Sequence, residues 1–413
     1  MHIELCGNGN EIGRAAYLVS DSKSSVMLDY GVKINPEPPQ YPLPAKPDAV
    51  VLSHAHLDHC GGMPLLYRHG TIPAFMTDVT LDLTKLLVED ALKVGKKQGY
   101  NTPFGVAEIK RMVKNAKLVD YGEQFRAGAF SGKLYDAGHI PGSAGVLLKN
   151  EKSVFYTGDI QTAESHLLSG CTLPKRADVL VTETTYSYKN HSPRIKEEER
   201  LVEHVEEALA REEIALFPVF SIGRAQEVLL ILEKYAHKIA LDGMAKQASD
   251  IIASYGARTK DSRRLKAVLR KINWIHTRED RLKALKRHSI ILATAGMLGG
   301  GPAIHYLREI KHRTESKVLF TGFLVEESPG RNLIETNIFK NAEEKFHVHC
   351  ELDKFELSAH TDRRGLFHII RKTNPATVIS VHGERCDDFA KDIEQEFPGI
   401  QAIAPRNGDT IRI

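Results

Sequence analysis

The apolar positions of the first 185 residues form short runs rather than long periodic stretches. Gly, Asp or Pro residues separate these runs, which cover 15–19, 25–29, 49–53, 132–137, 145–148, 153–157 and 178–183. Runs that are rich in β-branched and aromatic residues and bounded by turn residues predict β-strands. Between them, apolar residues recur three and four positions apart over 78–97 and 106–116, which predicts two helices.

From about residue 192 the pattern becomes a regular alternation of strands and helices. The predicted order is helix 194–211, strand 214–220, helix 224–235, strand 239–243, a basic helical region 262–272, strand 289–296, helix 301–310 and strand 317–323. Such alternation predicts an α/β fold with a mostly parallel sheet flanked by helices.

After residue 354 the first pattern returns. A strand-like stretch 355–360 precedes helix 363–372, strand 376–382, helix 387–396 and a short final strand. The sequence therefore predicts one domain built from both chain ends, 1–187 and 354–413, with a second α/β domain, 188–353, inserted between them.

Composition excludes several classes of protein. Apolar residues make up 42% of the 413 residues and charged residues 26%, which is typical of globular domains and not of disordered or repetitive chains. No apolar stretch approaches the ~20 residues of a membrane-spanning helix, and no signal-peptide pattern opens the chain. The 5 cysteines are scattered without a CxxC pair, so we expect a reducing, cytoplasmic location.

Charge is distributed unevenly along the chain. The net charge is only +3, but residues 258–287 contain twelve Lys and Arg against three acidic residues. Such a segment is either a solvated helix face or an electrostatic guide for a polyanion, and the sequence leaves both interpretations open.

The most specific motif is His-Ala-His-Leu-Asp-His at residues 54–59, directly after the apolar run 49–53. Imidazole nitrogens and carboxylates are ligands suited to Zn²⁺. His54 and His56 can point at one metal ion, and Asp58 and His59 at a second. Further candidate residues each follow a predicted strand and would converge on one sheet edge: Asp29, His139, Asp159, Glu183 and His382.

These residues resemble those of a known fold family. The 54–59 motif resembles the metal signature of the metallo-β-lactamase fold, an αββα sandwich, and Asp29, His139 and Asp159 match its other motifs in order. The resemblance implies two Zn²⁺ per chain. His54, His56 and His139 would hold one zinc, Asp58 and His59 the other, Asp159 would bridge them, and Asp29 would orient the cluster from behind.

The inserted domain narrows the resemblance to the β-CASP nucleases. Glu183, His360 in SAHTD and His382 in SVHGE resemble three motifs of that family, and His382 would complete the second zinc site. Segments 218–232 and 294–307 resemble its inserted domain. Together, HAHLDH and GMLGGGP are most similar to the cleavage-and-polyadenylation endonuclease subunit and its archaeal relatives. A histidine at position 382 resembles the RNA-directed members. We expect no KH-type extension before the first strand.

The resemblance implies a zinc-dependent ribonuclease. Two cations about 3.5–4 Å apart lower the pKa of a shared water, and the resulting hydroxide would attack an RNA phosphodiester in line, leaving a 5′-phosphate and a 3′-hydroxyl. His360 would protonate the leaving oxygen, with Glu183 favouring its protonated form. The catalytic candidates are Asp29, Asp58, Asp159, Glu183 and His360.

Candidate RNA contacts lie outside the metal motifs. Ser358 and the backbone at Ala359 can donate hydrogen bonds to a phosphate, and the Gly299–Gly300 turn leads into a helix whose N–H groups suit the same role. Ser221 and Arg224 begin another helix. We expect single-stranded RNA as the partner and no membrane association; a homodimer or membership of an RNA-processing complex is left open.

An endonuclease of RNA processing or decay is the favoured interpretation, with three alternatives. One is a 5′→3′ exoribonuclease, which would need a pocket for a 5′-monophosphate. Another is a non-catalytic RNA-binding subunit, although all the expected ligands are present. The third is a small-ester hydrolase of the same fold, against which the inserted domain, Glu183, His360 and His382 argue.

Overall fold

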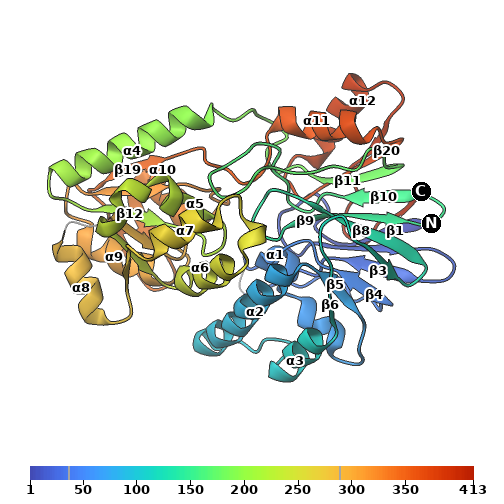
Figure 1. Ribbon diagram of the computed structural model, residues 1–413, viewed down its shortest axis with the longest axis horizontal. Coiled ribbons are helices and arrows are strands. Elements are labelled where there is room, and N and C mark those ends of the chain that lie inside the picture. The colour runs from blue at the N-terminus through green and yellow to red at the C-terminus, as the bar shows by residue number, and fades with distance from the viewer. Residues whose placement is uncertain (36–37, 288–289) are drawn as a thin grey trace. The chain divides into compact units, whose positions relative to one another are not determined.

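The chain folds into two compact units, one inserted into the other. The computed structural model describes residues 1–35, 38–287 and 290–413 (Figure 1). The first unit combines Met1–Glu164, Leu168–Asn190 and His360–Ile413, so both ends of the chain belong to it. The second unit consists of Ser165–Leu167 and His191–Ala359.

The first sheet of the first unit has the strand order β22-β1-β2-β3-β4-β5-β6. β1 pairs antiparallel with β2 and β22, and β2 with β3, whereas β3 through β6 run parallel. The strands are β1 His2–Gly7, β2 Ala16–Ser20, β3 Ser25–Leu28, β4 Ala49–Val51, β5 Ala74–Met76, β6 Ala116–Leu118 and β22 Thr410–Arg412.

The second sheet of this unit has the order β21-β20-β11-β10-β9-β8-β7. The strands are β7 Gln124–Ala127, β8 Phe130–Asp136, β9 Ala144–Lys149, β10 Ser153–Tyr156, β11 Val179–Glu183, β20 Thr377–Val381 and β21 Gln401–Ile403. The C-terminal segment thus supplies a strand to each sheet, β21 to this one and β22 to the first. The prediction of one short final strand was therefore incomplete.

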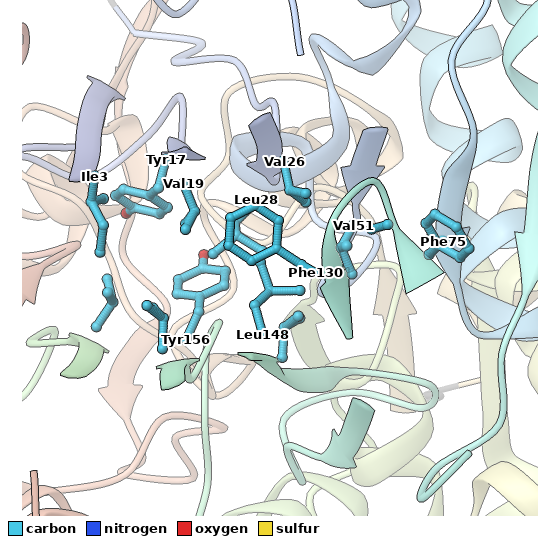
Figure 2. Close-up of a cluster of buried hydrophobic side chains, with 14 of the residues drawn as sticks. Ile3, Tyr17, Val19, Val26, Leu28, Val51, Phe75, Phe130, Leu148 and Tyr156 are labelled. Atoms are coloured by element: carbon cyan, nitrogen blue, oxygen red, sulfur yellow. The ribbon is translucent and has the colours of Figure 1, made fainter. Parts of the chain in front are cut away.

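The two sheets bury a shared hydrophobic core between their facing sides. Figure 2 shows side chains of the first sheet pointing toward side chains of the second: Ile3, Tyr17, Val19, Val26, Leu28 and Val51 toward Phe130, Leu148 and Tyr156. Side chains alternate across a strand, so the inward set of each strand forms this layer. The rings of Tyr17 and Tyr156 lie 5.1 Å apart in it, and Tyr156 also reaches the candidate site.

Helices cover the outer faces of the sheets (Figure 1). The helices of this unit are α1 Leu57–Cys60, the 3-10 helix Met63–Tyr67, α2 Asp78–Gln98, α3 Val106–Lys114, α11 Arg363–Thr373 and α12 Cys386–Glu396. Leu366 and Ile369 of α11 and Phe389 of α12 pack in one cluster with Phe155 and Leu180 of the second sheet. This arrangement confirms the predicted αββα sandwich.

The second unit contains a parallel sheet of order β14-β13-β15-β12-β16-β19. Its strands are β12 Ala215–Pro218, β13 Ile239–Asp242, β14 Asn273–Trp274, β15 Ile290–Ala293, β16 Lys317–Phe320 and β19 Glu351–Lys354. The predicted parallel sheet is confirmed. The first residue of the predicted strand 289–296, Ser289, lies outside the described residues.

Helices also flank the inserted sheet. They are α4 Arg194–Ala210, α5 Arg224–Ile231, α6 Ala245–Ser254, α7 Ser262–Leu269, α8 Arg278–Lys286, α9 Pro302–Ile310, α10 Pro329–Thr336 and the 3-10 helices Glu233–Lys238 and Gly256–Arg258. A hairpin of β17 Ile338–Lys340 and β18 Lys345–His347 follows α10.

The strand-like stretch predicted at 355–360 is wrong. The strand of this region is β19, which ends at Lys354 and pairs with β16 of the inserted sheet. Beyond it the Phe355 amide still bonds to the Phe320 carbonyl at 2.8 Å, but the following residues make no ladder. His360 then belongs to the first unit.

Candidate metal centre

The residues predicted to bind metal all follow strands of the first unit. His54 and His56 lie in the loop after β4, and Asp58 and His59 lie in the short helix α1. His139 follows β8, Asp159 follows β10 and His382 follows β20. Because these strand ends meet along one edge of the sandwich, residues far apart in sequence become neighbours.

One group of side chains comprises His54, His56, His139 and Asp159, whose candidate ligand atoms all lie within 4.8 Å of one another. Asp159 Oδ2 lies 3.4 Å from His54 Nε2 and 3.5 Å from His139 Nε2. His139 Nε2 is 3.0 Å from His56 Nδ1. The structure therefore brings three imidazoles and one carboxylate to a single point.

A second group comprises Asp58, His59, Asp159 and His382, again within 4.8 Å. The other oxygen of Asp159, Oδ1, lies 3.2 Å from His59 Nε2 and 3.7 Å from His382 Nε2. His382 Nε2 also lies 3.3 Å from Asp58 Oδ2. Asp159 is thus common to both groups and presents one oxygen to each.

The chemistry of these atoms fits metal cations. Within the described part of the chain, Nε2 of His54, His56 and His59 and Oδ1 of Asp159 are buried and have no hydrogen-bond partner. Buried polar atoms are nearly always satisfied, so the unsatisfied atoms of His54, His59 and Asp159, which lie beside one another, indicate a missing partner. A set of imidazole nitrogens and carboxylate oxygens is a typical zinc ligand set.

The Nδ1 atoms of four histidines are held by oxygen atoms. His59 Nδ1 donates to Asp29 Oδ2 at 2.7 Å and His54 Nδ1 to Ser53 Oγ at 3.0 Å. His382 Nδ1 lies 3.1 Å from Thr185 Oγ1, and His360 Nδ1 lies 2.9 Å from Glu183 Oε2. A proton fixed on Nδ1 leaves the Nε2 lone pair of a neutral imidazole available for a metal.

Asp29 lies behind the two groups and is fully buried. Its carboxylate accepts hydrogen bonds from the Ser53 amide at 2.6 Å, from Ser53 Oγ at 2.7 Å and from the Tyr156 hydroxyl at 2.7 Å, in addition to His59. Sequence reasoning missed Ser53, Tyr156 and Thr185. Ser53 directly precedes the histidine motif and Thr185 follows Glu183 by two positions, so only their proximity to a motif could have singled them out.

His360 and Glu183 adjoin the metal-binding groups. Glu183 is buried, its Oε1 accepts the Ile160 amide at 2.9 Å, and both of its oxygens lie within 3.0 Å of His360 Nδ1. His360 Nε2 lies 3.8 Å from Asp159 Oδ2, and the His360 ring lies 4.6 Å from the ring of His139. The structure therefore places this pair at the rim of the first group.

Burial and charge divide the histidines into two sets. Burial penalises the cation, which lowers the pKa of His54 and His139 and brings the pKa of His56 to about 3. Burial therefore favours the neutral form of these three rings, which can donate a lone pair. Burial acts against protonation of the second set as well, but nearby carboxylates outweigh it. Asp159 and Asp58 raise the pKa of His59 and His382, and Glu183 and Asp159 raise the pKa of His360 to about 9.

The predicted RNA contacts all lie in the second unit. Ser221 and Arg224 follow β12, and Gly299 and Gly300 lie between β15 and α9. β12 and β15 are adjacent and parallel, so both loops leave the same edge of the sheet. The two loops also approach each other closely, because a Cβ added to Gly296 after β15 would lie 3.0 Å from the amide nitrogen of Phe220 after β12. Arg224 is largely buried, whereas a Cβ on Gly299 or Gly300 would meet open space. Ser358 and Ala359 follow β19. Their contact with RNA stays a prediction.

The described helices include none that is both long and apolar enough to cross a lipid bilayer.

Three family profiles match the chain in consecutive segments that do not overlap. The metallo-beta-lactamase superfamily matches residues 9–201, the Beta-Casp domain matches 225–333, and the Zn-dependent metallo-hydrolase RNA specificity domain matches 345–405. The last segment contains both His360 and His382.

Curated relatives resemble the chain over its full length. It is 34% identical to Probable RNase MJ4 of Methanocaldococcus jannaschii, with 100% of both chains covered. It is 33% identical to RNase aCSPSF2 of Saccharolobus solfataricus, over 100% of this chain and 85% of that protein. It is 32% identical to the transcription termination factor FttA of Methanocaldococcus jannaschii, over 100% of this chain and 72% of that protein.

A solved structure has the same fold. A protein of unknown function from Enterococcus faecalis superimposes with a TM-score of 0.61 and 14% identity, over 99% of each chain. The fold, the His/Asp cluster and the full-length relatives agree with one another. The chain therefore belongs to the β-CASP family of metal-dependent ribonucleases within the metallo-β-lactamase superfamily.

Proposed function

We propose that the chain cleaves single-stranded RNA internally, with two zinc ions bound side by side in the candidate metal centre. The observation that carries the proposal is the division of the ligand atoms into two groups that share Asp159. His54, His56 and His139 would hold one ion and Asp58, His59 and His382 the other. Asp159 Oδ2 faces the first group and Oδ1 the second, as a bridging carboxylate requires.

Bound zinc ions would supply Lewis acidity, which makes a water molecule nucleophilic near neutral pH and offsets negative charge at the phosphate. The chain's contribution is to hold the ligands in place. Ser53, Asp29 and Thr185 each fix the Nδ1 proton of a ligand histidine, so the Nε2 lone pairs stay directed at the ions without reorganisation.

His360 is the proposed proton donor to the leaving 3′ oxygen. Glu183 accepts the proton on His360 Nδ1, so the second proton of the imidazolium resides on Nε2, which faces the Asp159 side of the centre. Loss of a positioned general acid typically costs about 10²–10⁴-fold in rate. Cleavage would leave a 5′-phosphate and a 3′-hydroxyl.

Several observations support RNA as the substrate. The segment that matches the RNA specificity domain contributes both His360 and His382, and two of the full-length relatives are named as ribonucleases. Internal cleavage is proposed on the similarity of HAHLDH and GMLGGGP to the cleavage-and-polyadenylation endonuclease subunit. A 5′→3′ exonuclease is the alternative.

Circular and linear RNAs of one sequence test the mode of cleavage. An endonuclease cleaves the circle, whereas an exonuclease acts on the linear form alone. If chelation and zinc restoration leave RNA turnover unchanged, the proposal of a metal-dependent ribonuclease is wrong.

Two histidine variants test the assignment of residues. We expect His139→Ala to lose bound zinc and cleavage together, and His360→Ala to keep its zinc while cleavage falls by about 10²-fold or more. His69→Ala, which replaces an exposed histidine of the same unit, is the matched control and should behave as wild type. Full cleavage by the His360→Ala variant would contradict the proposed proton transfer.

A further inference from the structure

Cationic side chains collect at the amino edge of the inserted parallel sheet, where the strands begin. Three adjacent strands, β14, β13 and β15, are each preceded by basic residues within the last few positions before the strand. We define these residues as the amino-edge rim: Lys238, Arg270, Lys271, Lys286 and Arg287. All are exposed, and the exposed His237 adjoins them.

Topology, rather than proximity in sequence, brings the rim together. Lys238 directly precedes Ile239 of β13, Lys271 lies two residues before β14, and Arg287 lies three residues before β15. Adjacent strands are about 4.8 Å apart, and three residues of chain reach at most about 10 Å. The five positions therefore share one continuous stretch of surface, although they span fifty residues of sequence.

Carboxylates do not neutralise the rim. Among the described residues none of the five makes an ion pair, whereas Arg264 of the same basic segment pairs with Glu233, Arg281 with Asp242 and Lys283 with Glu279. Some cations of the predicted basic segment are thus paired with carboxylates, whereas the rim residues are paired with none that the structure describes.

Helix capping alone does not account for this charge. Arg270 and Arg287 follow the last residues of α7 and α8, where a cation interacts favourably with the helix dipole. One cation near each helix end supplies that interaction, so Lys271 and Lys286 are not needed for it. Lys238 leads from a 3-10 helix into β13. Five unpaired cations close together favour a polyanionic partner.

We infer that the amino-edge rim binds the phosphate backbone of the RNA substrate outside the segment that is cleaved. This inference rests on the proposed function, because an RNA substrate is the polyanion that the proposed activity brings to the chain. The rim lies at the edge of the sheet opposite to the loops after β12 and β15. Strands of four residues separate the two edges by about 13 Å, so contact at both the rim and the loops that carry the predicted RNA contacts requires RNA longer than a segment that reaches those loops alone. The rim would therefore matter for long substrates and not for short ones.

The test uses the full chain and a variant in which all five rim residues are replaced by glutamine. RNA binding is measured by fluorescence anisotropy with a chelator present, so that no cleavage occurs, on a short and a long single-stranded RNA. We expect the rim variant to bind the long RNA at least about tenfold more weakly. Five lost phosphate contacts would reduce the slope of log affinity against log salt concentration by about 3.5, at about 0.7 per contact.

A control variant separates the rim from total charge. It replaces five exposed lysines of the first unit by glutamine, namely Lys93, Lys96, Lys97, Lys110 and Lys117, and therefore makes the same change in net charge. The inference is overturned if the two variants bind the long RNA equally, or if the rim variant loses affinity for short and long RNA alike.

Cleavage assays distinguish this inference from the proposed function. With zinc present, the rim variant should cleave the short RNA at the wild-type rate and the long RNA more slowly at subsaturating concentrations. If the rim variant cleaves both RNAs at the wild-type rate, the inference that the rim binds RNA is overturned, while the ribonuclease proposal stays intact. If the wild-type chain cleaves neither RNA, the proposed function fails instead.

Discussion

Replacing Ser53 with alanine tests whether the residues behind the ligands set the geometry of the metal centre. The Ser53 hydroxyl is buried; it donates to Asp29 Oδ2 at 2.7 Å and accepts the Nδ1 proton of His54 at 3.0 Å. Alanine removes both interactions but retains the backbone bond from the residue 53 amide to Asp29. The effect therefore comes from the hydroxyl alone.

The structure allows the magnitude to be worked out. A hydrogen bond to a charged group contributes about 1.5–3 kcal/mol and a neutral one about 0.5–1.5 kcal/mol, so the folded state should lose about 2–4.5 kcal/mol. His54 can also shift its proton from Nδ1, now without an acceptor, to Nε2, which removes the lone pair that faces Asp159. Loss of such a supporting contact typically weakens metal binding about 10–100-fold.

Ser380→Ala is the matched control for this substitution. Ser380 is also fully buried in the first unit, but in the described part of the chain its hydroxyl has no hydrogen-bond partner. Its loss should change stability by less than about 1 kcal/mol and leave zinc affinity unchanged, because no interaction disappears.

Zinc affinity is measured by competition with a chromophoric chelator, and stability by urea denaturation of the zinc-loaded and the zinc-free protein. The Ser53→Ala variant should weaken one of the two sites and lower stability in both states. If it matches Ser380→Ala in zinc affinity, the proposed role of the hydroxyl in holding His54 is refuted.

Three further predictions follow from the same structure. Thr185→Val removes the hydroxyl beside His382 Nδ1, and should weaken one zinc about tenfold or more in the same competition assay, with the other zinc unaffected. Phe130→Ala opens a cavity in the fully buried layer between the sheets, and should cost about 3–5 kcal/mol by urea denaturation; a loss below 1 kcal/mol would show that the layer closes around the gap. Chelation should lower the melting temperature of the wild-type chain, since bound ions stabilise only the folded state, and should have much less effect on His139→Ala; equal shifts in the two would place the bound metal elsewhere.

Sequence reasoning could predict that the candidate ligands lie together because each of them carries a local signal. The histidine motif lies directly after an apolar strand, and Asp29, Asp159 and His382 each end a short β-run, so their convergence follows from the meeting of strand ends at one edge. The supporting residues lack such a signal. Ser53, Tyr156 and Thr185 are ordinary strand-end residues, and only the folded register shows that their hydroxyls reach Asp29, His59 or His382.

The inserted unit shows which structural features local sequence patterns do not predict. Alternating strands and helices predicted its parallel sheet, but the strand order depends on which crossovers pass over which strands, and no short segment encodes that. The sequence analysis did not separate helices α6, α8 and α10. Helices α8 and α10 bury only two residues each, and the buried face of α6 consists mainly of alanine and serine, which give a weak apolar pattern. The stretch 355–360 was misassigned because its apolar residues Phe355 and Leu357 are buried without pairing in a sheet.

The distribution of the candidate site residues along the chain has a consequence for synthesis. Asp58 and His382 face each other at 3.3 Å across 324 positions of sequence, and the inserted unit is translated between them. A nascent polypeptide that has emerged only as far as Ala359 contains neither His360 nor His382. On the proposed assignment, ribosome-bound fragments of this nuclease cannot hydrolyse the message that encodes them until translation has passed His382.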